Sequence, residues 1–226
     1  MLKIALIALT ALPLFAGFFP ATVNTSIAAI SGENITLNRS LPRSGMSGVV
    51  IHNYGSDLKA ITSRFIQTSP GHAVLTDSDV IEHDSLPTIN TAIARGDKVI
   101  GGYLYNNVLV LAPDANTYAK ATASANKTWI HPDLYALYLS QEGEGTPSRE
   151  HLATFAKKYQ VGLIYTIKKG SVVLLDPISG KHVGQKAVSG NPSKAQFPFF
   201  MRFDKIDSGW FSKSATGTYY NLMETL

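Results

Sequence analysis

A change of pattern at Pro113 constrains the fold of this chain more than any other feature of its sequence. Before it, from Thr22 onward, short β-rich runs such as "NITLN", "GVVIHNYG", "HAVLT" and "VLVLAP" alternate with Gly, Pro, Asn and Asp. Many short strands with turn residues between them are typical of a small barrel or sandwich. We therefore expect a β-rich domain over residues 20–113. Asn106 and Asn107 suit a two-residue hairpin turn, because Asn tolerates positive φ.

After Pro113 the apolar residues take helical spacing. In "TPSREHLATFAKKY", Thr146 is the expected N-cap and Pro147 the first helical residue, with Leu152, Phe155 and Tyr159 on one face. The stretches "NTYAKATASAN" and "HPDLYALYLSQ" favour two more helices, on either side of a strand at "KTWI". Residues 114–226 are therefore expected to form an α+β domain.

The stretch from Tyr165 to Gln185 predicts a β-meander. A turn at Lys168-Lys169-Gly170 separates "VGLIYTI" from "SVVLL", and a second turn after Asp176 leads into "KHVGQKAV". The predicted fold class is α+β, with an N-terminal small β-barrel or sandwich followed by a C-terminal meander sheet flanked by helices.

The same stretch invites comparison with a phosphate-binding loop, and the comparison fails. Such a loop needs Gly, four residues, and then Gly-Lys-Ser/Thr, so that backbone amides surround the phosphate while the hydroxyl reaches magnesium. Here Leu175 stands at the first Gly position and His182 at the hydroxyl position, around Gly180-Lys181. We expect no nucleotide and no other cofactor.

Catalytic and metal-binding motifs do not emerge elsewhere. The six histidines lack metal-ligand spacing, and no G-x-S-x-G nucleophile motif occurs. The acidic residues of "LTDSDVIEHD" indicate a hydrophilic connection rather than an acid/base pair. We expect no catalytic residue, although a hydrolase with an unrecognised motif stays an alternative.

The N-terminus has the layout of a secretory signal peptide, expected over residues 1–19. A positive charge at Lys3 precedes an apolar run that reaches small residues at Ala16 and Gly17. An uncleaved anchor is the alternative, because Leu14 is large for its position before the cut. No later stretch is apolar enough to span a membrane, and cysteine is absent. We expect an exported protein in the periplasm or on the outer surface of a Gram-negative bacterium.

Charge and aromatic residues bear on possible partners. Residues 114–226 hold thirteen Lys and Arg against nine Asp and Glu, a modest excess that favours an ordinary solvated face over a nucleic-acid site. In "FPFFMRF", a strand would direct Phe199 and Met201 to one side and Phe200 and Arg202 to the other. Core packing accounts for one side. An exposed Phe200 beside Arg202 would suit a protein partner, since interfaces are enriched in aromatic residues and Arg.

Four segments, in this order and spacing, resemble a known family. They are "GDKVIGGYLYNNVLVLAPDANTY", "WIHPDLYALYLSQEG", "FAKKYQVGLIYTIKKGSVVLLDPISG" and "PFFMRFDKIDSGWFS". Together they resemble the N-terminal domain of the bacterial plasminogen-binding protein PgbA family. The resemblance implies an exported envelope domain without known enzymatic activity, associated with capture of host plasminogen.

The resemblance also implies which residues would bind plasminogen. In the founding proteins binding is assigned to a Lys/Glu-rich tail ending in lysine, whereas this sequence ends at Leu226. Plasminogen binding would then need internal lysines near a carboxylate: Lys168, Lys169 and Lys181 near Asp176, or Lys205 between two aspartates. Our leading hypothesis is a non-catalytic scaffold or protein-interaction module of the cell envelope, with plasminogen binding as an alternative.

Overall fold

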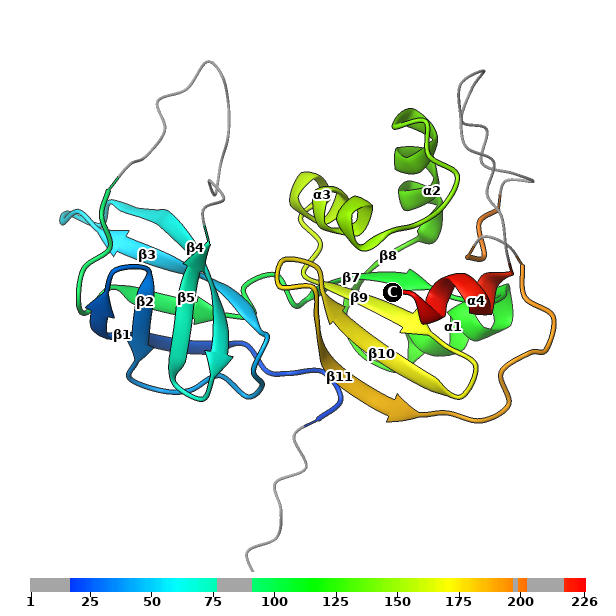
Figure 1. The fold of residues 1–226 in the computed structure, drawn as a ribbon, viewed down its shortest axis with the longest axis horizontal. Helices are drawn as coiled ribbons and strands as arrows, with labels where there is room; N and C mark the ends of the chain where they lie inside the picture. The colour runs from blue at the N-terminus through cyan, green and yellow to red at the C-terminus, as the bar shows by residue number, and fades with distance from the viewer. Residues whose placement is uncertain (1–16, 77–90, 197–198, 203–217) are drawn as a thin grey trace, which may run out of the picture.

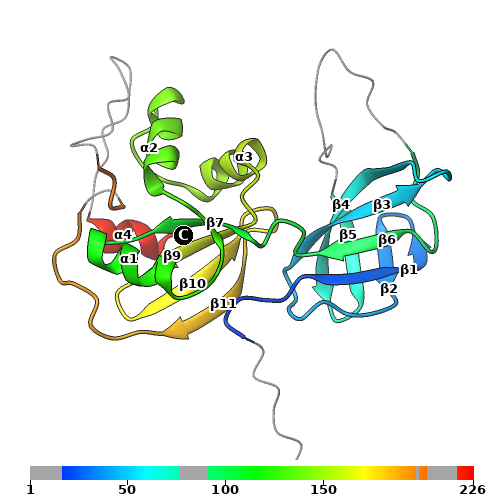
Figure 2. The same ribbon diagram turned by 180° about the vertical axis from the view of Figure 1, so that it is seen from behind.

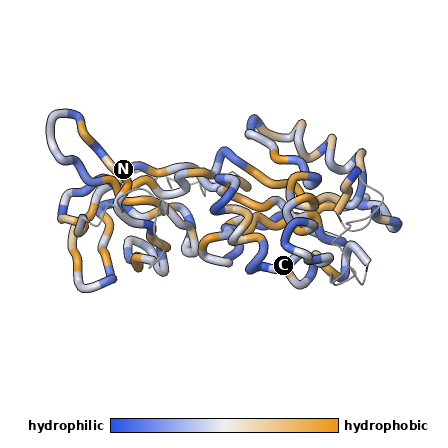
Figure 3. The backbone as a smooth tube through the Cα atoms, turned by 90° about the horizontal axis from the view of Figure 1, so that it is seen from above, coloured by the Kyte–Doolittle hydropathy of each residue, from blue (hydrophilic) through white to orange (hydrophobic). Residues whose placement is uncertain are grey.

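The computed structural model of the chain describes residues 17–76, 91–196, 199–202 and 218–226. A closed β-barrel lies beside a mixed β-sheet that carries helices, as Figures 1 and 2 show from opposite sides. This is the α+β architecture expected from the sequence, with the barrel formed by the N-terminal part. Apolar residues follow the strands of both units in Figure 3, whereas many of the turns are polar.

The barrel closes through antiparallel pairs in the order β1-β2-β5-β4-β3-β6. Alternation along each strand turns apolar side chains such as Ile27, Val50, Phe65 and Val99 into a fully buried interior. Register shifts in β1, β3 and β4 mark bulges, which help a small sheet to bend into closure. The strands are β1 (Val23–Ser31), β2 (Asn34–Leu37), β3 (Ser47–Asn53), β4 (Lys59–Ser69), β5 (His72–Thr76) and β6 (Lys98–Gly101).

The second sheet has the order β11-β10-β9-β7-β8. Strands β9, β10 and β11 form the expected antiparallel meander, and β7 lies parallel to both β8 and β9. The strands are β7 (Asn107–Leu111), β8 (Thr128–Ile130), β9 (Leu163–Ile167), β10 (Ser171–Asp176) and β11 (Lys181–Ala187).

Strand β7 corrects one expectation. It does not pair with β6 in a hairpin at Asn106-Asn107, but enters the middle of the second sheet. The passage from barrel to sheet therefore lies between β6 and β7, ahead of Pro113. The physical reason is visible in "VLVLA": residues 108–111 are all fully buried, and an unbroken apolar run is typical of a strand covered on both faces.

The helices begin where capping side chains precede them. Asp114 accepts a hydrogen bond from Thr117 N–H at the start of α1 (Ala115–Ala123), and His131 caps α2 (Pro132–Gln141). Ser148 caps α3 (Arg149–Tyr159), so the expectation of Thr146 as the cap was wrong by two residues. Both residues suit an N-cap, but the Ser148 hydroxyl is the one that accepts from His151 N–H.

Different elements cover the two faces of the second sheet. One face packs against α2, α3, α4 (Tyr219–Glu224) and the buried side chains of Phe199 and Met201. The other face packs against α1 and against Phe18 and Phe19, whose rings lie 5.7 and 6.1 Å from that of Tyr165. Phe18 and Phe19 thus contribute to the folded body, although the leader was expected to run to residue 19. Its first sixteen residues lie outside the described part of the chain, and cleavage stays a prediction.

Candidate functional site

A buried carboxylate joins the barrel to the second sheet. Asp176, at the end of β10, has no exposed surface. Its Oδ2 accepts hydrogen bonds from Ser47 N–H of β3 (2.8 Å) and from the Tyr105 hydroxyl (2.6 Å), which lies between β6 and β7. Its Oδ1 accepts from the backbone N–H groups of Ile178 and Ser179, at 2.9 and 3.1 Å. We call Asp176, Ser47 and Tyr105 the junction.

The local turn explains how the carboxylate is positioned. An Asp at the start of a turn accepts hydrogen bonds from the backbone two and three residues ahead, and this fixes one oxygen. The other oxygen is left to point at the barrel. Burial and the adjacent negative charge of Asp176 both raise the pKa of Tyr105 well above 10.0, so its hydroxyl stays a proton donor at neutral pH.

Two glycines allow the units to approach closely at the junction. A Cβ on Gly162 would lie 2.0 Å from the backbone oxygen of Leu104, so only glycine lets the connecting segment cross the start of β9. A Cβ on Gly45, whose φ is +85°, would lie 2.7 Å from the Cβ of Lys181. Both positions exclude larger residues for reasons of contact between the two units.

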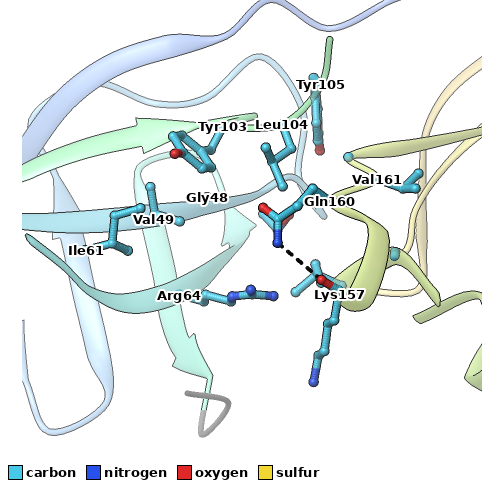
Figure 4. A pocket seen from close by; sticks show the side chains of 14 residues that line it. Gly48, Val49, Ile61, Arg64, Tyr103, Leu104, Tyr105, Lys157, Gln160 and Val161 are labelled. Atoms are coloured by element: carbon cyan, nitrogen blue, oxygen red, sulfur yellow. Dashed lines mark hydrogen bonds between the residues drawn. The ribbon is translucent and has the colours of Figure 1, made fainter. Parts of the chain in front are cut away.

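Beside the junction an open cleft of about 230 Å³ lies between the units. Ser47 and Tyr105 form part of its wall, so the junction is also the side of this cleft. Figure 4 shows Arg64 of β4 extending toward the end of α3, where Gln160 and Lys157 lie, with Tyr103 on the barrel side. Further lining comes from Gly48, Val49, Ile61, Leu104, Ala156, Val161, Gly162 and Ile178.

The end of α3 is held firmly against the sheet where it lines the cleft. Gln160 adopts a left-handed conformation with φ of 56° and its N–H bonds Ala156 O, which ends the helix. Its side chain donates to Lys157 O at 3.2 Å, the dashed bond in Figure 4. Its own carbonyl accepts from Asn107 Nδ2 at 2.8 Å, which ties the turn to β7.

The cleft carries positive charge. Arg64 is half-buried, and burial lowers the pKa of its guanidinium, which still remains protonated at neutral pH. Lys157 is exposed in the last turn of α3. Among the described lining residues none is acidic. The described lining of the cleft is therefore partly apolar and partly cationic.

The lysines singled out from the sequence do not converge. Lys168 and Lys169 lie at one end of the β9–β10 hairpin. Lys181 lies at the other end of β10, where it is opposite Asp176 in the register of β10 and β11. The six residues of β10 span about 17 Å. Lys168 is buried, with its Nζ 3.9 Å from Glu224, whereas Lys169 and Lys181 are exposed.

Asp176 is not available as a carboxylate partner for any of these lysines on the surface. It is fully buried and its oxygens already accept four hydrogen bonds. The alternative at Lys205, with its flanking aspartates, lies outside the described residues, as does the acidic stretch at residues 77–84. Whether any lysine binds a partner stays a prediction.

Phe200 and Arg202 lie in a segment that packs against α1 and the start of α2. As expected, Phe199 and Met201 are buried, while Phe200 is half-buried and Arg202 exposed, although the segment is not a strand. The Phe200 ring packs at 5.5 Å against both Tyr118 and His131. Arg202 bonds Asp133 through its backbone N–H and its Nε. These contacts anchor the segment to α1 and α2; a role in partner binding stays a prediction.

Within the described ranges, no group of three or more His, Cys, Asp or Glu side chains is arranged to hold a metal ion. None of the helices in this part of the chain has the length and apolarity needed to cross a bilayer.

Comparison with known proteins identifies the family of this chain. The family model described as plasminogen-binding protein pgbA N-terminal matches residues 22–226. The chain therefore belongs to the plasminogen-binding protein pgbA N-terminal family, as its sequence segments indicated. No curated protein and no solved structure gives a match.

Sequence reasoning missed the cleft residues Arg64, Tyr103 and Lys157. They are separated by up to 93 positions and none belongs to a motif, so only the packing of the two units brings them together. One signal was present: the stretch "GGYLYNN", rich in glycine and tyrosine, connects β6 of the barrel to β7 of the second sheet, and binding sites often lie where two units meet.

Proposed function

We propose that this chain is an exported, non-catalytic module of the cell envelope, and that it binds a segment of a partner protein in the cleft between barrel and sheet. The observation that carries the proposal is the cleft itself, a concave site with apolar walls and two cationic side chains beside a fixed junction. Binding sites concentrate where two units meet. The family match, to a plasminogen-binding protein, supports a protein as the partner.

The hydrogen bonds made by the buried polar groups favour a binding function over a catalytic one. Asp176 and Tyr105 have the burial and the raised tyrosine pKa that active sites often show. Here they bond each other and the backbone of the opposite unit, so their hydrogen bonds serve to hold the units together. Export rests on the leader-like residues 1–19 of the sequence.

The test is capture of a partner in intact envelopes with variants of the cleft. The protein, the variant Lys157→Glu and the matched control Lys120→Glu, an exposed lysine of α1, are each crosslinked and purified from fractionated cells. We expect the same partner with wild type and control, and its loss with Lys157→Glu. Equal capture by all three, or recovery of the protein only from the cytoplasm, would contradict the proposal.

The family match favours a second candidate, direct binding of plasminogen through internal lysines. The exposed Lys169 and Lys181 are the described candidates named from the sequence that could reach a kringle pocket. We expect a lysine analogue to compete with binding, and Lys169→Gln or Lys181→Gln to weaken it. Binding unaffected by the analogue would rule out the lysine pocket as the route.

A further inference from the structure

We propose that the leader of this chain ends before Phe18, with the cut after Ala16 or Gly17. Phe18, Phe19 and Pro20, which we call the strap, remain in the mature protein and tie the second sheet to the first strand of the barrel. This inference rests on the export part of the proposed function, because only an exported chain meets a leader peptidase. In that reaction water adds to the carbonyl carbon of the cut bond, the C–N bond breaks, and the freed amine becomes the new N-terminus.

Aromatic side chains of the second sheet receive the two rings of the strap. The Phe18 ring lies edge-on, 5.7 Å from the ring of Tyr165 on β9. The Phe19 ring lies 6.1 Å from the same tyrosine and 6.1 Å from Trp129 on β8. Aromatic rings with centroids about 4.5–7 Å apart attract each other. Both phenylalanines are half-buried in this cluster and Pro20 is buried, so the strap belongs to the packed body.

Two lysines add contacts to the same rings. The Nζ of Lys186 on β11 lies 4.6 Å from the centre of the Phe18 ring, and the Nζ of Lys127 lies 5.1 Å from that of Phe19. An ammonium within about 6 Å of an aromatic ring is attracted to its face. Lys127 also donates a hydrogen bond to Tyr105 O at 3.1 Å, so it joins the strap to the segment that connects barrel and sheet.

A glycine on β11 makes room for the backbone of the strap. A Cβ on Gly184 would lie 2.6 Å from Phe18 O, so a larger residue would push the strap away. Figures 1 and 2 show the segment that leads into β1 passing beside β11. Further along, the Thr22 hydroxyl donates to Gly102 O at 3.0 Å. The chain is therefore held on the second sheet at Phe18, and on the connecting segment at Thr22, before β1 begins.

The small residues that a leader peptidase requires lie directly ahead of the strap. Such an enzyme selects a small residue immediately before the cut bond, and Ala16 and Gly17 supply one. A cut after Phe19 would place a large ring at that position and would remove both rings from the sheet. The sequence requirement and the packing therefore both favour a cut before Phe18.

The first experiment determines where the mature protein begins. The whole chain is produced in Gram-negative cells and recovered from the fractionated envelope, and its intact mass and N-terminal sequence are measured. We expect a start at Gly17 or Phe18. A start at Phe19 or later, or an uncut chain in the envelope, would overturn this proposal and leave export standing. An uncut chain found only in the cytoplasm would overturn export as well.

A double-mutant cycle in the protein recovered from the envelope then tests the contact between strap and sheet. Gly184→Ala forces a Cβ against Phe18 O, whereas the double variant Phe18→Ala/Phe19→Ala removes the rings that hold this oxygen in place. We expect Gly184→Ala to lower the urea midpoint of the wild type about twice as far as that of the double variant. Gly170→Ala, with nothing within 4 Å of its Cβ position, is the control and should act equally in both. An equal effect of Gly184→Ala in both would overturn the strap.

Tryptophan fluorescence provides a second measurement if these variants are too unstable for unfolding curves. Phe19→Ala removes the ring that packs against Trp129, so the indole becomes more exposed and the emission should shift to longer wavelength. Leu58→Ala, at a barrel residue that is 65% exposed, is the control and should leave the emission unchanged. An unchanged emission in Phe19→Ala would also overturn the strap.

Discussion

The junction and the cleft lie between the same two units and share Ser47 and Tyr105, yet they differ in exposure, charge and hydrogen bonding. The junction is closed, acidic and fully hydrogen-bonded around Asp176. The cleft is open and cationic, and its Lys157 and Tyr103 are exposed. A buried charge without partners is costly, so an acid can lie at such a boundary only when donors surround it. An exposed cation has no such requirement and stays available for a ligand.

This difference predicts that the junction contributes mainly to stability and the cleft mainly to binding, although both lie between the same two units. Substitutions at the junction should alter the free energy of unfolding, because they remove donors or acceptors that water cannot replace. Substitutions at the cleft should alter ligand affinity and leave the free energy of unfolding nearly unchanged. Variants that violate this division would show that the two regions act as one.

Asp176→Asn should have the largest effect. The amide oxygen can keep the turn bonds to Ile178 and Ser179, but the amide nitrogen would face the donors of Ser47 and Tyr105. Hydrogen bonds to a charged group contribute about 1.5–3 kcal/mol each, so we expect a loss of about 3 kcal/mol. Urea unfolding measures it, with Asp57→Asn in the exposed β3–β4 turn as the control. A loss below 1 kcal/mol would mean that the junction contributes little.

Gly162→Ala should come next. The added Cβ would lie 2.0 Å from Leu104 O, so the connecting segment must shift, at a cost of about 2 kcal/mol. Because Leu104 also lines the cleft, this variant should be the one that changes both stability and binding. Gly170→Ala is the matched control, since nothing lies within 4 Å of its Cβ position. A stable Gly162→Ala variant with unchanged ligand affinity would contradict this prediction.

The features that could be predicted from the sequence are those that depend on residues close together in the chain. Alternation and turn residues predict the barrel strands and the β9–β11 meander, because register within neighbouring strands is a local property. The hairpin at Asn106-Asn107 was wrong, because the same local signal fits a crossover between units. The helix cap shifted from Thr146 to Ser148 for a similar reason: both residues are suitable, and packing decides between them.

The junction and the cleft themselves lay beyond sequence reasoning. The turn expected at Asp176 is present, but the hydrogen bond between its carboxylate and Ser47 N–H spans 129 positions. The sequence singled out Lys168, Lys169 and Lys181 because they flank turns. Arg64 and Lys157 lie within a strand and a helix and belong to no motif. Which exposed cation lines a concave surface depends on how the units pack, and no local pattern reports that.

Tyr105→Phe should cost less than either substitution above. It removes one donor to Asp176 Oδ2, which keeps its bond from Ser47 N–H, and a single hydrogen bond to a charged group contributes about 1.5 kcal/mol at the low end of its range. Tyr103→Phe, on the open side of the same segment, is expected to change the free energy of unfolding by less than about 0.5 kcal/mol. Equal losses in the two variants would remove the contrast between closed junction and open cleft.

The pH dependence of the hydrogen-bonded pair Tyr105 and Asp176 gives the smallest effect, and it tests the charge of the junction most directly. Burial and Asp176 raise the pKa of Tyr105 above 10.0, so the folded state keeps a proton that the unfolded state loses above that pH. The tyrosine's contribution is therefore fully present below pH 10 and declines as pH rises beyond it. One pH unit above 10 the decline is about 1.4 kcal/mol. Urea unfolding at pH 7 and pH 11 should consequently show the wild type losing its advantage over Tyr105→Phe. A difference that persists unchanged at pH 11 would place Tyr105 in water rather than against a buried acid, and the junction would then resemble the cleft.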